Sequence, residues 1–147
     1  LARCLEQQGI HAYLVGIDGE MRAAGRKADG SVWLVALEKP LKGRREVLGA
    51  LELHDTAIAT SGDYRHWRER DGSVHSHTMD PHSGAPLMST LTSVSVICTS
   101  CMYADAWATA LLVLGVERGS QLAKAQGLSA IFVLREGDEL REITVGL

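Results

Sequence analysis

Two polar side chains near the middle of the chain stand at a spacing that suits metal chemistry. Within Ala104–Thr109, Asp105 and Thr109 are four residues apart, so on a helix they would share one face and lie one turn from each other. A carboxylate and a hydroxyl are hard oxygen ligands, which Mg²⁺ and Ca²⁺ prefer. We expect Asp105 in the first helical turn, where the helix dipole favours an anion. The same spacing also fits a structural pair, with Asp105 capping the helix and Thr109 bonded to the preceding turn.

A second candidate is the polar segment Ser76–Gly84. His77 and Asp80 stand three residues apart, and Pro81 with Gly84 predicts a tight turn that could present backbone N–H groups to a ligand. A histidine in such a place could act as a general base, a phosphate partner or a metal ligand. Solvent-facing loop histidines are the alternative interpretation.

A third candidate follows a short apolar strand. Ser61 and Asp63 offer polar groups at the end of that strand, and Gly62 between them allows close approach of a ligand to the backbone. The arrangement is typical of a turn that contacts phosphate. A nucleophilic serine is disfavoured, because no Gly-x-Ser-x-Gly elbow is present.

The cysteines allow a different function. Cys98 and Cys101 have the spacing of a redox pair ahead of an expected helix. However, the total of three cysteines is odd, and no proline follows Pro86, whereas thioredoxin-like folds place a cis-proline after the pair. We therefore favour two small buried thiols, and keep a thiol-redox protein as an alternative.

The elements expected around these segments favour an α+β architecture, because helices and strands do not alternate strictly. Helices are expected over Leu1–Gly9, Met102–Leu114 with Thr99 or Ser100 as its cap, and Glu117–Gln126. Strands are expected at Ala12–Ile17, Glu20–Ala24, Ser31–Leu37, Val47–Leu53, Ala57–Thr60, Thr92–Ile97, Ala130–Leu134 and Glu142–Val145. Ser61–Pro86 is predicted to be a long polar loop, and Thr92–Ile97 a central strand.

Composition narrows the class of protein. The chain has 147 residues, 46% of them hydrophobic and 22% charged, which suits one globular domain with a single core. Its net charge is −3, so we expect no nucleic-acid partner and no attraction to an anionic membrane. No apolar run is long enough to predict a membrane span in this segment. The chain opens inside an expected helix, so we expect a fragment of a larger domain.

Taken together and in this order, the segments resemble the C-terminal signature of the ApbE family, the FAD:protein FMN transferases. The resemblance rests on Ala59–Arg65, on Ser76–Pro81 with Gly84, and on Ala104–Thr109 followed by Leu112–Gly115. It extends over Tyr13–Gly25 and Trp33–Pro40, and so covers nearly all of the chain. It implies that residues 1–147 form the C-terminal part of an ApbE-like domain, with a mixed, largely antiparallel sheet layered with helices.

The resemblance also implies an activity. Such enzymes use Mg²⁺ to cleave FAD, attach FMN through a phosphoester bond to a threonine of an acceptor protein, and release AMP. It implies roles for individual side chains as well: Asp105 and Thr109 as metal ligands, His77 as the catalytic or phosphate-positioning group, and Met79, Thr78, Ser61, Gly62 and Asp63 as cofactor-binding residues. A flavin-binding module that holds FAD without transferring FMN is the main alternative.

The chain departs from the family pattern in three ways. Asp18-Gly19 stands where the family often has two glycines, and Ala108 stands where some members carry a third acid beside the metal. The glycine-rich stretch that precedes the first helix in the family is not among these 147 residues, and we expect it upstream of them. Because the family is commonly exported and membrane-tethered in bacteria, we expect a periplasmic location or a tether upstream of this segment.

Overall fold

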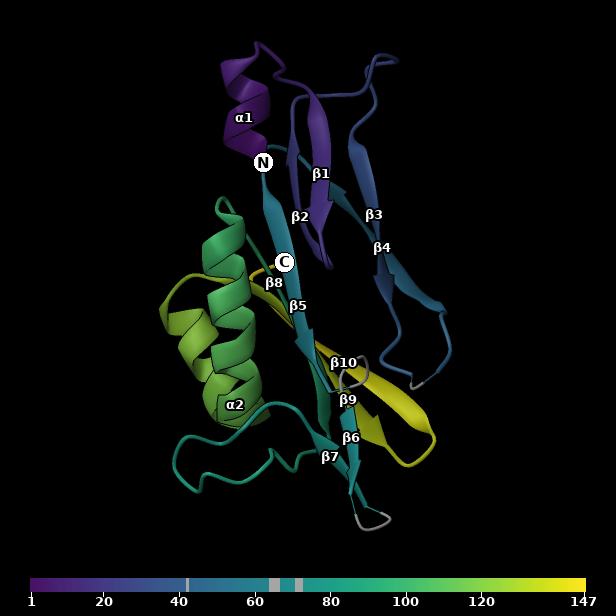
Figure 1. Cartoon of the computed structure of the whole chain (residues 1–147), viewed down its shortest axis with the longest axis vertical. Helices are drawn as coiled ribbons and strands as arrows, with labels where there is room; N and C mark the ends of the chain where they lie inside the picture. Colours follow the sequence, from purple (N-terminus) through teal and green to yellow (C-terminus); the bar gives the residue numbers. More distant parts are fainter. Residues whose placement is uncertain (42, 64–66, 71–72) are drawn as a thin grey trace.

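The central feature of the protein is a six-stranded sheet with strand order β1-β2-β5-β8-β9-β10. The computed structural model describes residues 1–41, 43–63, 67–70 and 73–147. The sheet strands are β1 (Tyr13–Ile17), β2 (Glu20–Ala24), β5 (Ala57–Gly62), β8 (Leu91–Cys98), β9 (Ser129–Glu136) and β10 (Glu139–Val145). Every neighbouring pair is antiparallel. With its helices, this arrangement confirms the predicted α+β class and the central position of the 92–97 segment (Figure 1).

The hairpin between β1 and β2 shows how one departure from the family pattern is accommodated. Asp18 and Gly19 form its two-residue turn with φ angles of 51° and 109°. Tight hairpin turns of this length need residues that tolerate positive φ, and aspartate is one of the few non-glycine residues that do. Asp18 is therefore compatible with this turn.

One face of the sheet is covered by the long helical segment α2 (Cys101–Ala125) (Figure 1). The apolar core between them includes Val94, Val96 and Phe132 from the sheet. α2 is interrupted at Gly115, whose φ of 76° and ψ of 177° are not helical. After this break the chain returns on itself, since a Cβ on Gly119 would lie 3.0 Å from the carbonyl oxygen of Leu111. The two helices predicted from the sequence are therefore the two halves of α2.

The opposite face of the sheet is covered by a separate hairpin of β3 (Trp33–Glu38) and β4 (Val47–Leu53), which Figure 1 shows on the other side from α2. Because successive strand residues point to opposite faces, Ile58 and Ile131 face this hairpin while their neighbours face α2. Leu53 of β4 is completely buried among them. The sheet thus lies between two distinct apolar cores.

The short helix α1 (Ala2–Gln7) is attached to the sheet by polar contacts rather than by a buried face. The hydroxyl of Tyr13 donates a hydrogen bond to Glu6, with 2.5 Å between the oxygens. Arg22 donates from Nε to the Tyr13 hydroxyl and from a terminal nitrogen to the carbonyl of Thr99, at 3.3 and 3.2 Å. One guanidinium therefore joins α1, the β1–β2 hairpin and the segment that leads into α2.

Two local predictions were wrong, and a third, the capping of α2, holds for the position but not for the hydrogen bond. The polar segment predicted as a single loop contains an antiparallel hairpin of β6 (Trp67–Arg70) and β7 (Ser73–Ser76). Ser100 is at the N-cap position of α2, but its side chain makes no capping hydrogen bond. Because α2 begins at Cys101 and has no acidic residue in its first turn, Asp105 lies in the second turn, beyond the strongest effect of the helix dipole.

Candidate functional site

The candidate metal ligands lie along the seam where α2 crosses β5. Ala59 on the strand, and Ala104 and Ala108 on the helix, are all completely buried. Alanine side chains in these positions allow the two backbones to approach closely, since only methyl groups separate them. Ser61 follows Ala59 on the same face of the strand, and Thr109 directly follows Ala108 on the helix. Packing of the core therefore brings the third and first candidate segments together.

The contact between these segments is a hydrogen bond between two hydroxyls. Ser61 Oγ lies 2.8 Å from Thr109 Oγ1, across 48 residues of sequence, and either atom could be the donor. Asp105 lies one turn before Thr109 and its side chain is exposed, as is that of Thr109. A carboxylate and a hydroxyl thus share one accessible helix face, with a second hydroxyl beside them.

These donors fit a hard cation such as Mg²⁺ better than a transition metal. Among the described residues, no three histidine, cysteine, aspartate or glutamate side chains gather as a metal site. One carboxylate and one hydroxyl leave most of an octahedral shell to other oxygens, and Mg²⁺ usually takes those from water and substrate phosphates. Asp105 and Thr109 are the residues of this chain that would hold it.

Ala108 does not occupy an open position in a metal shell. Its methyl group is completely buried in the core between α2 and the sheet. An acid at this position would have to displace core side chains or turn past them, which is costly without a partner. The alanine therefore serves packing, and its small size helps to bring Thr109 close to β5.

The other two residues of the third segment are not part of this seam. Gly62 is still within β5 and pairs with Ser93, so it lies in a strand rather than in a turn, and its contact with the cofactor stays a prediction. The backbone N–H of Asp63 donates to the carbonyl of Thr92 at 3.1 Å. Asp63 lines a cavity of about 440 Å³ whose other lining residues come from outside α2: Leu41, Arg44 and Arg135. Tyr64 and Arg65, at the end of the quoted motif, lie outside the described residues.

The second segment forms the predicted tight turn, but two of its backbone N–H groups already donate hydrogen bonds within the turn. Asp80 accepts hydrogen bonds from the backbone N–H of His82 at 2.8 Å and from the hydroxyl of Ser83 at 3.0 Å. The N–H of Gly84 donates to the Asp80 carbonyl at 2.8 Å. The bonds from His82 and then from Ser83 hold the pKa of the Asp80 carboxyl below its ordinary value. Asp80 therefore organises the turn, and the expectation that the turn presents N–H groups to a ligand is wrong for these two amides.

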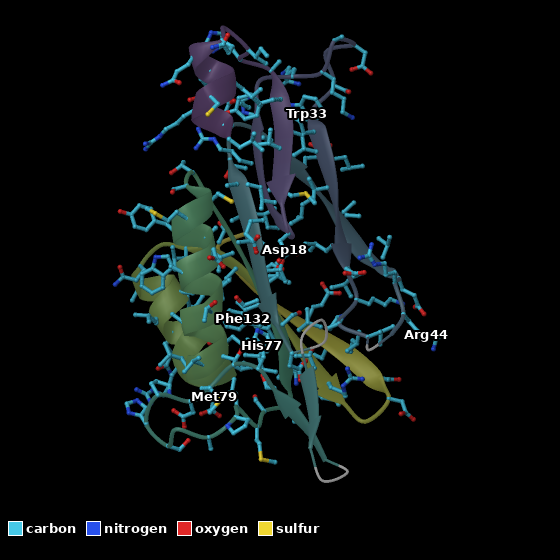
Figure 2. The ribbon with its side chains drawn as sticks, viewed as in Figure 1. Asp18, Trp33, Arg44, His77, Met79 and Phe132 are labelled. Atoms are coloured by element: carbon cyan, nitrogen blue, oxygen red, sulfur yellow. The ribbon has the colours of Figure 1, made fainter. Side chains whose placement is uncertain are left out.

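The predicted flavin contacts of this segment lie on its surface. Met79 is 49% exposed and forms an isolated antiparallel β-bridge with Pro86. The backbone N–H of Thr78 donates a hydrogen bond to the Ser76 hydroxyl at 3.1 Å. His77 is exposed. In Figure 2, His77 and Met79 lie toward the end of the molecule at which β5 finishes. The described contacts of Thr78 and Met79 stay within their own loop, so a role in binding flavin stays a prediction for both.

Comparison with known proteins identifies the family. The sequence model of the ApbE family matches residues 1–132. The chain belongs to the ApbE family. It is 43% identical over 142 residues to the FAD:protein FMN transferase of Vibrio cholerae, covering 97% of this chain and 42% of that protein. It is 38% identical to the Escherichia coli K12 protein of the same name, covering 96% and 40%.

The structural comparison agrees. The crystal structure of the flavinyl transferase ApbE from Pseudomonas stutzeri, in its apo form, superimposes with a TM-score of 0.82 at 44% identity, covering 98% of this chain and 44% of that one. The ApbE-like fold predicted from the sequence is thereby confirmed. The chain spans about two fifths of the length of the curated relatives it matches. That residues 1–147 are the C-terminal part of a larger domain stays a prediction.

Cys101, one of the two cysteines of the redox alternative, does not have the environment of a reactive thiol. The pKa of Cys101 is raised, chiefly by burial and further by the negative charges of Glu20 and Asp105. Reactive thiols of redox pairs need a lowered pKa, because the thiolate is the nucleophile. Cys98 donates from its sulfur to the carbonyl of Ser100 at 3.0 Å. In this ApbE-family chain the pair therefore behaves as two small, partly buried side chains.

Interpretation of the sequence missed one feature of the site. It assigned Ser61 to the flavin and did not anticipate the bond between Ser61 and Thr109. The signal was present in the sequence, since Ala59 with Ser61 and Ala104 with Ala108 are the small residues expected where a helix crosses a strand closely. The contact itself could not be predicted, because its two residues are 48 positions apart in the sequence. Helical and strand periodicity describe single elements and do not predict which elements pack together.

Proposed function

We propose that this chain is part of an Mg²⁺-dependent flavin transferase that moves FMN from FAD to a threonine of an acceptor protein and releases AMP. Family membership and the names of its relatives support flavin transfer. The observation that carries the metal chemistry is the seam, where Asp105 and Thr109 share an exposed helix face beside Ser61. The acceptor threonine rests on the resemblance to the family. None of the described helices has the length and apolar character of a membrane span.

The proposed reaction is an in-line phosphoryl transfer. The hydroxyl oxygen of the acceptor threonine attacks the phosphorus on the FMN side of the FAD diphosphate. A P–O bond to threonine forms, the P–O bond to the bridging oxygen breaks, and AMP leaves with that oxygen. The threonine proton passes to a base, for which His77 is the candidate. Mg²⁺, when bound, would neutralise the diphosphate charge and so favour both attack and departure.

The roles of the side chains follow from their positions. Asp105 supplies the one full negative charge of the seam, and Thr109 a neutral oxygen on the same helix face. Both elements that carry the seam are fixed by the buried core, so the ligands are held without help from the loops. His77 lies on the exposed turn-forming segment and is the candidate base.

The test uses the full-length protein with FAD, Mg²⁺ and an acceptor domain carrying the target threonine. We expect the acceptor band to fluoresce after denaturing electrophoresis, with one AMP released for each FMN attached. The same domain with that threonine replaced by valine, and a reaction containing EDTA, are the controls. Flavin that binds but is lost on denaturation, without AMP release, would favour the non-catalytic module instead.

A periplasmic or membrane-tethered location remains part of the proposal and rests on the family resemblance alone. Fractionation of cells producing the full-length protein tests it. Recovery of the protein only with cytoplasmic markers would contradict that location.

A further inference from the structure

We propose that Ser61 is a positioning residue for Thr109: it accepts the Thr109 hydroxyl proton and so turns a lone pair of Thr109 toward the metal. This inference rests on the proposed metal site and assigns Ser61 a role other than direct contact with flavin. It concerns a second hydroxyl that the Asp105–Thr109 spacing does not include.

The first step concerns the hydrogen-bond partner of the Thr109 hydroxyl. A threonine within a helix commonly bonds back to a carbonyl of the preceding turn. Here the Thr109 hydroxyl bonds instead to Ser61 Oγ on the neighbouring strand, at 2.8 Å. This bond fixes the direction of the hydroxyl relative to the sheet, not only relative to its own helix.

The second step is a count of protons. A threonine hydroxyl has one proton and two lone pairs. When one lone pair faces a cation, the proton must point away from it, toward an acceptor. Ser61 Oγ is that acceptor, so Thr109 becomes the donor of a bond whose direction is otherwise open. The proton of Ser61 can then be donated to another acceptor.

The third step is rigidity. Ser61 is within β5, paired with Val94 of β8, and follows the completely buried Ala59. Thr109 follows the completely buried Ala108. Neither backbone can shift without disturbing the core. The short hydrogen bond between the two side chains therefore sets one orientation of the Thr109 hydroxyl. Residues that orient metal ligands in this way typically change metal affinity or activity by about 10- to 100-fold when removed.

The sheet offers a matched control. Thr60 and Ser95 form a similar hydroxyl pair on adjacent strands, with 2.7 Å between their oxygens. Because Thr60 and Ser61 are neighbours on one strand, their side chains point to opposite faces. Ser95→Ala therefore removes a hydroxyl bond of the same kind beside the seam without touching Thr109.

The experiment measures Mn²⁺ binding to the full-length protein by the free Mn²⁺ signal in electron paramagnetic resonance, with thermal unfolding alongside. We expect Ser61→Ala to weaken Mn²⁺ binding by about 10-fold or more, Ser61→Thr to restore it, and Ser95→Ala to leave it unchanged. In a Thr109→Val background, Ser61→Ala should cause no further loss, because the group that it positions is gone. If Ser61→Ala does not fold, Ser61→Cys keeps nearly the same shape with a weak acceptor, and should also weaken binding.

Three results would overturn the inference in distinguishable ways. Normal Mn²⁺ affinity in Ser61→Ala, with Asp105→Ala and Thr109→Val both weakened, would remove the positioning role alone. Normal affinity in all three variants would remove the metal assignment itself, and with it the metal site on which the proposed function relies. Losses that simply add in the double variant would also contradict positioning, because they would show that Ser61 acts independently of Thr109.

Discussion

The seam between β5 and α2 and the turn-forming loop around His77 position their side chains by different means. In the seam, completely buried alanines on both elements determine where Ser61, Asp105 and Thr109 lie. In the loop, the bonds are local: Asp80 holds the turn through its own neighbours, and Met79 is about half exposed. The seam is fixed by the buried core, whereas the Asp80 turn is held by hydrogen bonds within a short segment.

This difference indicates how the two regions can divide the work. A metal ligand must be held closely, so a site on rigid elements suits it. A residue that meets a large substrate benefits from a segment that can adjust, and surface loops commonly provide such residues. Substitutions of the seam side chains should therefore alter metal binding, and substitutions in the backbone that supports them should alter the free energy of unfolding. Changes in the loop should alter the reaction while leaving the fold intact.

The largest expected effect is that of Asp105→Ala on activity. The variant should abolish detectable FMN transfer, a loss greater than the roughly 100-fold typical of residues that only support metal ligands. Its stability should change little, because the side chain is exposed and lies beyond the first turn of α2. In-gel flavin fluorescence of the acceptor and thermal unfolding measure the two effects.

Glu117→Ala is the matched control, since Glu117 is an exposed acid on the second half of the same helical segment. It should transfer FMN at the normal rate. Normal transfer by Asp105→Ala in limiting Mg²⁺ would show that the seam is not the metal site.

The next effect is that of His77→Ala in the loop. If His77 acts as the base or positions the phosphate, transfer should slow by about 10²–10⁴-fold, with thermal unfolding unchanged because the side chain is exposed. His82→Ala is the control in the same turn, because the bond from His82 to Asp80 is made by its backbone. A single-turnover assay with saturating FAD measures the rate.

A double variant, Cys98→Ser with Cys101→Ser, sharpens this result by testing the redox alternative. It should transfer FMN at a near-normal rate, since the raised pKa of Cys101 keeps that thiol protonated at neutral pH. An inactive double variant beside an unimpaired His77→Ala would reverse the ranking of the two sites.

Much of the fold could be predicted because its signals are local. The β-branched run at 92–97 and the Asp18-Gly19 turn indicated β8 and the first hairpin, and Gly127 marked the end of α2. The β6–β7 hairpin was missed because its sequence is polar and offers no apolar alternation. The spacing of Asp105 and Thr109 could be recognised because both lie on one helix. The sequence did not show which other segments lie beside them, so the site was predicted as separate segments. The bond to Ser61 arises only when the helix packs on the strand.

A smaller effect, on the free energy of unfolding, is expected from a change in the backbone of α2, the helical segment that carries the seam. Gly115 interrupts α2 with φ of 76° and ψ of 177°, a conformation essentially limited to glycine. Gly115→Ala should lower the free energy of unfolding by about 1–3 kcal/mol, measured by urea denaturation of the full-length protein. Gly49→Ala is the control, because a Cβ there meets nothing within 4 Å, and its effect should stay within about 1 kcal/mol. Equal stability of the two variants would mean that the break in α2 stores no strain against a side chain.

The smallest effect is expected in the loop and depends on pH. The pKa of Asp80 is lowered, first by the hydrogen bond from the His82 N–H and then by that from Ser83. The carboxylate therefore supports the turn fully above the unfolded-state pKa, about 3.9 for aspartate. That support is lost as the pH falls through the lower folded-state value.

Acidification should move the His82 amide resonance toward its position in Asp80→Ala, while the seam amides of Ser61 and Thr109 stay unchanged until the protein unfolds. An amide spectrum recorded across this range at constant salt is the measurement. If the seam and the turn respond together at the same pH, the two regions are coupled and the loop is not held by its own bonds alone.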